Sequence, residues 1–230
     1  MIRAKAILFD LDGTIFDMSE RDAFSRFEAL GRLGYDISLH DVRRCYSWGI
    51  GRFGVIRALG IKLPDEEIEK YLRLRFTSFM DRKNALSLTR IHKGAHEVLS
   101  SLSVRYKLAL VTSRDGLLST EEELQWFNIR KFFDWVVTRE VAAAYHGIRE
   151  IPLFPFQEQR TKLYECVIGL TRIEPEDMLF IGDSLGELEP AKRLNIKAVG
   201  VLTGWGSKAE MDDADIPTIR NITEIFKILT

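Results

Sequence analysis

The sequence is poor in the features that mark several large classes of protein. Its two cysteines, Cys45 and Cys166, lie far apart, which provides neither a disulfide framework nor the close spacing of zinc ligands. No apolar run reaches the roughly 20 residues that a membrane-spanning helix needs. The 33 Lys and Arg nearly balance the 34 Asp and Glu, so the basic excess of a nucleic-acid-binding protein is missing. We therefore expect a cytoplasmic protein without a secretory signal, which binds neither nucleic acid nor membrane.

Five short and nearly uninterrupted apolar runs are present in the sequence. Strands that are buried on both faces of a parallel sheet have this pattern, because helices cover both sides of the sheet. Helical spacing follows between the later runs, so the order of elements predicts an α/β fold with a Rossmann-like, doubly wound parallel sheet. We also expect a capping box at Ser119 and Glu122, an irregular stretch over Arg139–Arg160 and a terminal helix over Ile222–Leu229. The five runs are Ala6–Phe9, Leu108–Val111, Trp135–Val137, Met178–Ile181 and Ala198–Leu202.

Residues 17–84 interrupt this alternation of strands and helices. Phe24, Phe27, Leu30 and Leu33 recur every three residues, as is typical of helices with an apolar face. The stretch has helical patterns and no convincing strand, so we expect an inserted helical cap over residues 17–84. Residues 1–16 and 85–230 would then form the Rossmann-like catalytic core.

Residues 7–14, Ile-Leu-Phe-Asp-Leu-Asp-Gly-Thr, are the most informative segment of the chain. An apolar strand ends at Asp10, a second carboxylate follows at Asp12, and Gly13 permits a sharp turn. Two carboxylates at one strand end repel each other unless a cation lies between them. Asp-Gly is also a common turn dipeptide, and Asp-x-Asp-Gly opens calcium loops, although the calcium loop needs its glycine two positions later. We favour a Mg²⁺ site with one carboxylate free to attack phosphorus.

Polar groups also follow two later strands of the predicted sheet. Thr112 and Ser113 come after Leu108–Val111 and could hold phosphate oxygens, although small hydroxyl residues often simply end strands. Asp183 follows Met178–Ile181, and a third carboxylate at this edge favours a metal. Glu187 would face the same site from the first turn of a helix, or would simply complement the helix dipole.

With these motifs in place, the chain resembles the haloacid dehalogenase-like hydrolases, and particularly their phosphatase branch. Asp10-Leu-Asp12-Gly13-Thr14 is similar to the first motif of the family, Thr112 to the second, and Gly182-Asp183-Ser184 with Glu187 to the acidic last motif. The resemblance covers essentially the whole chain. It implies a Rossmann-like core with a mobile cap and Mg²⁺-dependent phosphoryl transfer through an aspartyl-phosphate.

The resemblance also implies roles for individual residues. Asp10 would be the nucleophile and a metal ligand, and Asp12 would be the general acid and base while its backbone carbonyl binds the metal. Asp183 would be a further ligand, and Glu187, which stands where the family usually has Asp, would reach the metal or its waters. Because the sequence has no Lys-Pro pair of the kind the family often carries, Lys162 is the candidate that joins Thr112 in holding the phosphoryl group.

The substrate class follows from the chemistry, while its identity does not. We expect a small phosphorylated metabolite, with Arg52 of the cap as a candidate substrate contact beside Thr112 and Ser113. A dehalogenase lacks an acid two residues after its nucleophile, so Asp12 argues against that reaction. A phosphomutase or phosphotransferase of the same fold, and a metal- or phosphate-binding regulatory module without turnover, remain as alternatives.

Overall fold

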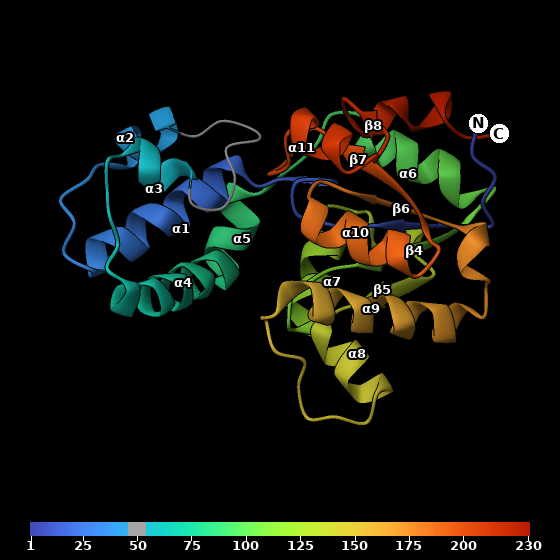
Figure 1. The fold of residues 1–230 in the computed structure, drawn as a ribbon, viewed down its shortest axis with the longest axis horizontal. Coiled ribbons are helices and arrows are strands. Elements are labelled where there is room, and N and C mark those ends of the chain that lie inside the picture. The colour runs from blue at the N-terminus through green and yellow to red at the C-terminus, as the bar shows by residue number, and fades with distance from the viewer. Residues whose placement is uncertain (46–53) are drawn as a thin grey trace.

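A computed structural model describes residues 1–45 and 54–230. Its main feature is a six-stranded parallel sheet with helices on both faces (Figure 1). The strand order is β5-β4-β1-β6-β7-β8, in which β1 lies between β4 and β6 near the centre. The strands are β1 (Ala6–Phe9), β4 (Lys107–Val111), β5 (Trp135–Val137), β6 (Met178–Gly182), β7 (Lys197–Val201) and β8 (Thr218–Ile219).

The central strands are apolar throughout because alternate residues enter two different cores. Ile7 and Phe9 of β1 pack in the cluster that contains α6 (Ala95–Ser103) and α7 (Leu117–Trp126). Ala6 and Leu8 pack in the opposite cluster. The helices of that second face are α8 (Arg139–Tyr145), α9 (Phe156–Thr171), α10 (Leu185–Arg193) and α11 (Lys208–Asp213). Residues 90–230 also contain three short 3-10 helices, which are η1 (Arg130–Phe132), η2 (Pro175–Asp177) and η3 (Ile222–Lys227).

The parallel α/β sheet expected from the sequence is confirmed, and all five predicted strands are present within a residue or so of their predicted ends. Other predictions about single elements were wrong or only partly right. The α-helix α7 starts at Leu117 after Gly116, so Ser119 does not cap it. The terminal segment is helical over Ile222–Lys227, as expected, but it forms the 3-10 helix η3. The stretch Arg139–Arg160 is irregular only over residues 146–155, because α8 occupies its start and α9 begins at Phe156.

The inserted region consists of helices in the part that the structure describes. They are α1 (Ser19–Arg32), α2 (Leu39–Cys45), α3 (Gly54–Ala58), α4 (Asp65–Met80) and α5 (Arg82–Leu88). Figure 1 shows this helical group to one side of the sheet and its covering helices. Three of them, α1, α3 and α4, share a small core of Ala29, Leu30, Ile56 and Tyr71. An antiparallel pair, β2 (Phe16–Asp17) with β3 (Arg90–Ile91), joins the two connections of this group.

The division of the chain into a cap over residues 17–84 and a core over residues 1–16 and 85–230 stays a prediction. Among the described residues, no helix combines the length and the apolar character needed to cross a lipid bilayer.

Candidate active site

The site lies at the carboxyl ends of adjacent parallel strands, where open α/β sheets bind ligands. The hydrogen-bond ladder of the sheet runs up to it: the Asp10 N–H donates to Ile181 O at 2.9 Å, and the Thr112 N–H donates to Val137 O at 3.0 Å. A cavity of about 410 Å³ opens at this edge. Six of the predicted site residues line it, namely Asp10, Asp12, Thr112, Ser113, Asp183 and Glu187.

Gly13 turns the chain away from the site in a backbone conformation that few other residues adopt. Its φ is +90°, and a Cβ at this position would lie 2.7 Å from Asp183 Oδ2. The turn is held from the β7–α11 loop, where the Thr203 hydroxyl donates to Gly13 O at 2.7 Å. In the same loop the Trp205 N–H donates to Asp183 Oδ2 at 2.6 Å, which fixes this carboxylate. The glycine is therefore required by the close approach of Asp183.

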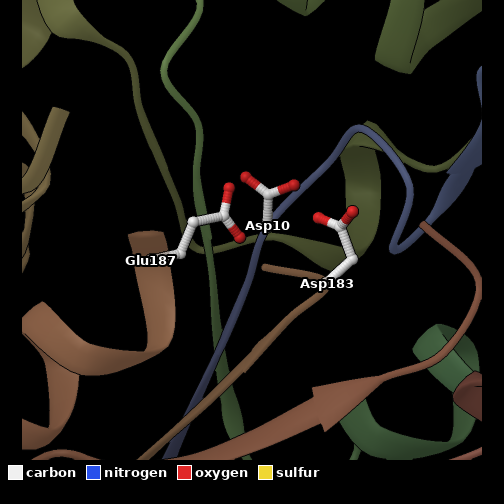
Figure 2. Close-up of side chains that lie close together, drawn as sticks. All are labelled: Asp10, Asp183 and Glu187. Carbon is white, nitrogen blue, oxygen red and sulfur yellow. The ribbon is translucent and has the colours of Figure 1, made fainter. Parts of the chain in front are cut away.

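Three carboxylates converge at the base of the cavity. Figure 2 shows Asp10 between Asp183 and Glu187, and oxygen atoms of all three lie within 4.8 Å of one another. Burial raises the pKa of Asp183 to about 8 and that of Glu187 to about 7. Burial and the nearby Glu187 also raise the pKa of Asp10. Such a cluster needs either protons or a cation at neutral pH.

The donor set of this cluster fits a divalent cation. Carboxylate oxygens are the ligands that Mg²⁺ prefers. Glu187 Oε2 is buried and has no hydrogen-bond partner among the described residues, so one oxygen is available to a ligand. When ionised, Asp10, Asp183 and Glu187 carry three negative charges beside the single positive charge of Arg160, and one divalent cation would neutralise the remaining charge of −2.

Arg160 is the residue of the cluster that the sequence interpretation missed. It is fully buried, and its Nη2 donates to Asp10 Oδ1 at 2.5 Å and also contacts Glu187 Oε1. Its Nη1 donates to Val111 O at 3.0 Å, which anchors the guanidinium to the end of β4. Arg160 thus lies behind Asp10 and Glu187 and holds both in place.

Lys162, the predicted phosphoryl-binding residue, does not line the cavity. Residues two apart on an α-helix point about 200° apart, so Lys162 faces away when Arg160 faces the sheet. The backbone carbonyl of Lys162 lies 3.0 Å from His146 Nε2. The phosphoryl-binding role of Lys162 therefore stays a prediction, and the basic side chain of α9 that contacts the acidic cluster is that of Arg160.

A signal for Arg160 was present in the sequence. Pro155 immediately precedes α9, and proline commonly marks the start of a helix. If the helix is started there, Arg160 falls on the same face as Leu163, Tyr164 and Val167, all of which are buried. A charged residue on the apolar face of a helix is rarely buried unless it pairs with an opposite charge. For Arg160 the opposite charges are the carboxylates at the strand ends.

Asp12 is held by a second arginine that the sequence interpretation also missed. Arg114 Nε donates to Asp12 Oδ2 at 2.9 Å, and its Nη2 donates to Asp12 Oδ1 at 2.7 Å. This bidentate ion pair fixes the plane of the carboxylate. Arg114 comes two residues after Thr112, so the loop that offers Thr112 and Ser113 to the cavity also orients Asp12.

A buried chain of charges continues from Arg114 into the inserted helices. Arg114 Nη1 lies 2.8 Å from Glu123 Oε1 in α7, and Glu123 Oε2 accepts from Arg21 Nη1 of α1 at 2.8 Å. Arg21 Nε donates to Phe79 O at the end of α4, at 2.5 Å, and Arg21 Nη1 donates to Thr89 Oγ1 at 3.3 Å. Burial, and then the like charge of Arg114, lower the pKa of Arg21 to about 10. The chain connects Asp12 to both ends of the helical insertion.

The remaining predicted residues divide into two groups. Ser113 lines the cavity while its hydroxyl donates to Gln159 Oε1 at 2.8 Å, and Thr112 is almost fully buried at its wall. Arg52, the predicted substrate contact of the cap, lies outside the described residues.

The chain has a doubly wound sheet, an acidic cluster after β1 and β6, and helices inserted after β1. Together these features define a class of phosphoryl-transfer hydrolases. The family model of the haloacid dehalogenase-like hydrolases matches residues 7–150, and the chain belongs to this family. Its resemblance to the phosphatase branch is confirmed, and the protein is a hydrolase of that branch.

Curated relatives and solved structures agree with this assignment. The chain is 27% identical to a phosphoglycolate phosphatase of Aquifex aeolicus, over 87% of this chain and 86% of the relative. It is also 27% identical to a 5'-nucleotidase of Pseudomonas aeruginosa, over 97% of both chains. A haloacid dehalogenase-like protein from Streptococcus pneumoniae has the same fold, with a TM-score of 0.74, 18% identity and 98% coverage of both chains.

Proposed function

We propose that this protein is a Mg²⁺-dependent phosphatase that hydrolyses a small phosphomonoester through a phosphoryl group carried on Asp10. The observation that carries the proposal is the position of Asp10 in the cavity, flanked by Asp183 and Glu187 and followed two residues later by Asp12. The names of its relatives, which include phosphoglycolate phosphatase and 5'-nucleotidase, support a small phosphorylated metabolite as substrate.

The metal would be held by side chains of Asp10, Asp183 and Glu187 and by the backbone carbonyl of Asp12. When bound, Mg²⁺ supplies positive charge that reduces the repulsion between an anionic nucleophile and an anionic phosphoryl group. The balance of −2 in the cluster and the available Glu187 Oε2 support this ligand set.

The residues of the chain divide the reaction into two displacements. An oxygen of Asp10, oriented by Arg160, attacks phosphorus while the bond to the leaving oxygen breaks and Asp12 protonates that oxygen. A water molecule then gives a proton to Asp12 and attacks the same phosphorus, which releases phosphate and restores Asp10. The Thr112 hydroxyl and the backbone N–H of Ser113 hold the phosphoryl oxygens, since the Ser113 hydroxyl donates to Gln159. Arg114 keeps Asp12 in the orientation that both proton transfers need.

A panel of phosphomonoesters, assayed with and without Mg²⁺, tests the proposal. We expect phosphate release that requires Mg²⁺ and is lost in Asp10→Asn, while Asp36→Asn, an exposed carboxylate of the insertion, keeps full activity. Beryllofluoride, which imitates a phosphoryl group on a carboxylate, should bind Asp10. Phosphate transfer to a sugar hydroxyl instead of water would favour a mutase, and the absence of any Mg²⁺-dependent reaction would contradict the proposal.

A further inference from the structure

Two arginines of the inserted helices line the same cavity as the catalytic carboxylates. They are Arg26 of α1 and Arg75 of α4, two helices that pack side by side (Figure 1). Arg26 is fully buried, and the Arg75 side chain is 19% exposed. Neither residue belongs to the catalytic cluster, so their presence in the wall calls for a separate explanation.

The two guanidiniums share one carboxylate. Arg26 Nε donates to Asp22 Oδ2 at 2.6 Å, and Arg75 Nε donates to Asp22 Oδ1 at 3.1 Å. Although burial opposes ionisation, Arg75 and Arg26 lower the pKa of Asp22, which keeps it charged. Two positive charges against one negative charge leave a net charge of +1 in the wall of the cavity.

Trp205 places these arginines near the reacting atoms. Its ring lies 5.0 Å from the guanidinium carbon of Arg26 and 6.0 Å from that of Arg75. The backbone N–H of the same residue donates to Asp183 Oδ2 at 2.6 Å. Trp205 therefore contacts both the catalytic Asp183 and the two arginines, and all four of these residues line the same cavity.

The rest of this wall is mostly apolar, because α4 contributes Leu72, Phe76, Phe79 and Met80. Glu210 is the only described acidic lining residue outside the catalytic carboxylates, and it accepts from the Ser207 N–H and hydroxyl at 2.9 Å. Of the three nitrogens of Arg75, Nη1 makes no hydrogen bond to any described residue and is available to a ligand.

We propose that Arg75, backed by Arg26, binds a second anionic group, a carboxylate or a phosphate, on the leaving-group side of the substrate. Nε and Nη2 of Arg75 donate to Asp22, and Nη1 can donate a charge-assisted hydrogen bond to an oxygen of such a group. This inference rests on the proposed phosphatase function and specifies its substrate class: a phosphomonoester whose leaving group is itself anionic.

Two esters that differ only in this group provide the test. 2-Phosphoglycolate carries a carboxylate where 2-hydroxyethyl phosphate carries a hydroxymethyl group, and 1,2-ethanediol bisphosphate distinguishes a carboxylate from a second phosphate. We expect kcat/KM of the wild type to be at least ~10-fold higher for an anionic ester than for the neutral one. Arg75→Gln should lower kcat/KM for the anionic ester ~10- to 100-fold, mainly by raising KM. The same substitution should change kcat/KM for the neutral ester less than ~3-fold. Arg75→Lys should retain part of the preference.

The chain offers a matched control on the same helix. Arg73 pairs with Glu69 and its side chain is 79% exposed, so Arg73→Gln should leave all three esters unaffected. Arg75→Gln should remain folded because Asp22 keeps Arg26 as a partner, and its melting temperature checks this. An equal loss for charged and neutral esters, or a wild-type enzyme with no preference for an anionic ester, would overturn the inference.

A binding measurement separates this inference from the proposed function. Calorimetry with 3-phosphonopropionate and 3-hydroxypropylphosphonate requires no turnover. If no ester is hydrolysed but the carboxylate analogue binds more tightly and loses that advantage in Arg75→Gln, the anion subsite stands and the phosphatase proposal fails. If esters are hydrolysed and Arg75→Gln has no selective effect on either measurement, the phosphatase proposal stands and the subsite does not.

Discussion

The buried carboxylate of Glu123 should be important for both stability and activity, because it lies between two arginines that belong to different parts of the molecule. Arg114 contacts it from the Thr112 loop and Arg21 from α1, and the three side chains are at most 4% exposed. Glu123→Gln keeps the volume but removes the charge, so two buried guanidiniums lose their shared counter-charge. The substitution tests whether this chain of charges holds the inserted helices against the site.

The expected magnitude follows from the burial. Breaking a buried ion pair by removing one partner costs about 3–5 kcal/mol, and the low end applies here because the Gln carbonyl oxygen still accepts one hydrogen bond. For a chain of 230 residues, a loss of about 3 kcal/mol lowers the melting temperature by roughly 6–12 °C. This is a large part of the stability of a typical domain, but the protein should remain folded.

The neighbouring residue supplies the control. Glu122 on the same helix also pairs with an arginine of the insertion, Arg82, but the two side chains are 41% and 73% exposed. Glu122→Gln should therefore cost less than about 1 kcal/mol. Thermal unfolding of both variants compares the two, and phosphatase assays should show a kcat loss of at least ~10-fold in Glu123→Gln alone, because Arg114 no longer orients Asp12. Equal melting temperatures for the two variants would refute this account of the network.

Three further predictions concern the acidic cluster. Asp10→Asn should reduce Mg²⁺-dependent phosphate release at least ~1000-fold with an unchanged circular dichroism spectrum, and substantial residual turnover would contradict a nucleophilic role. Arg160→Met should lower the free energy of unfolding by about 3–5 kcal/mol in chelator, and Mg²⁺ should restore part of it; urea titrations measure both. Burial raises the pKa of Glu187 to about 7 and that of Asp183 to about 8, so the native protein holds protons that the unfolded chain releases. The free energy of unfolding in chelator should therefore be higher at pH 6 and decline as the pH rises through 7 to 8. Urea titrations that give the same free energy of unfolding at pH 6 and pH 9 would contradict this.

The sequence by itself determined the sheet and the residues at its strand ends. Apolar runs without alternation predict strands covered on both faces, and the polar residues that interrupt them, Asp10, Thr112 and Asp183, lie at one edge of the sheet. This works because the strand pattern is local and because parallel strands all end at the same edge. β8, with only two residues, was too short to leave such a pattern.

Only the tertiary structure decided which charged side chains meet at that edge. Arg160 and Asp10 are 150 residues apart, and Arg114 and Asp12 are 102 apart, so no local spacing relates them. Which side chain of α9 meets Asp10 depends on where α9 begins and which of its faces meets β4. The position of Arg75 in the cavity wall depends on how α4 packs against α1. Local pattern sets where a chain becomes strand or helix, but the partner of a buried charge is set by packing between distant segments, because burial makes an unpaired charge too costly to keep.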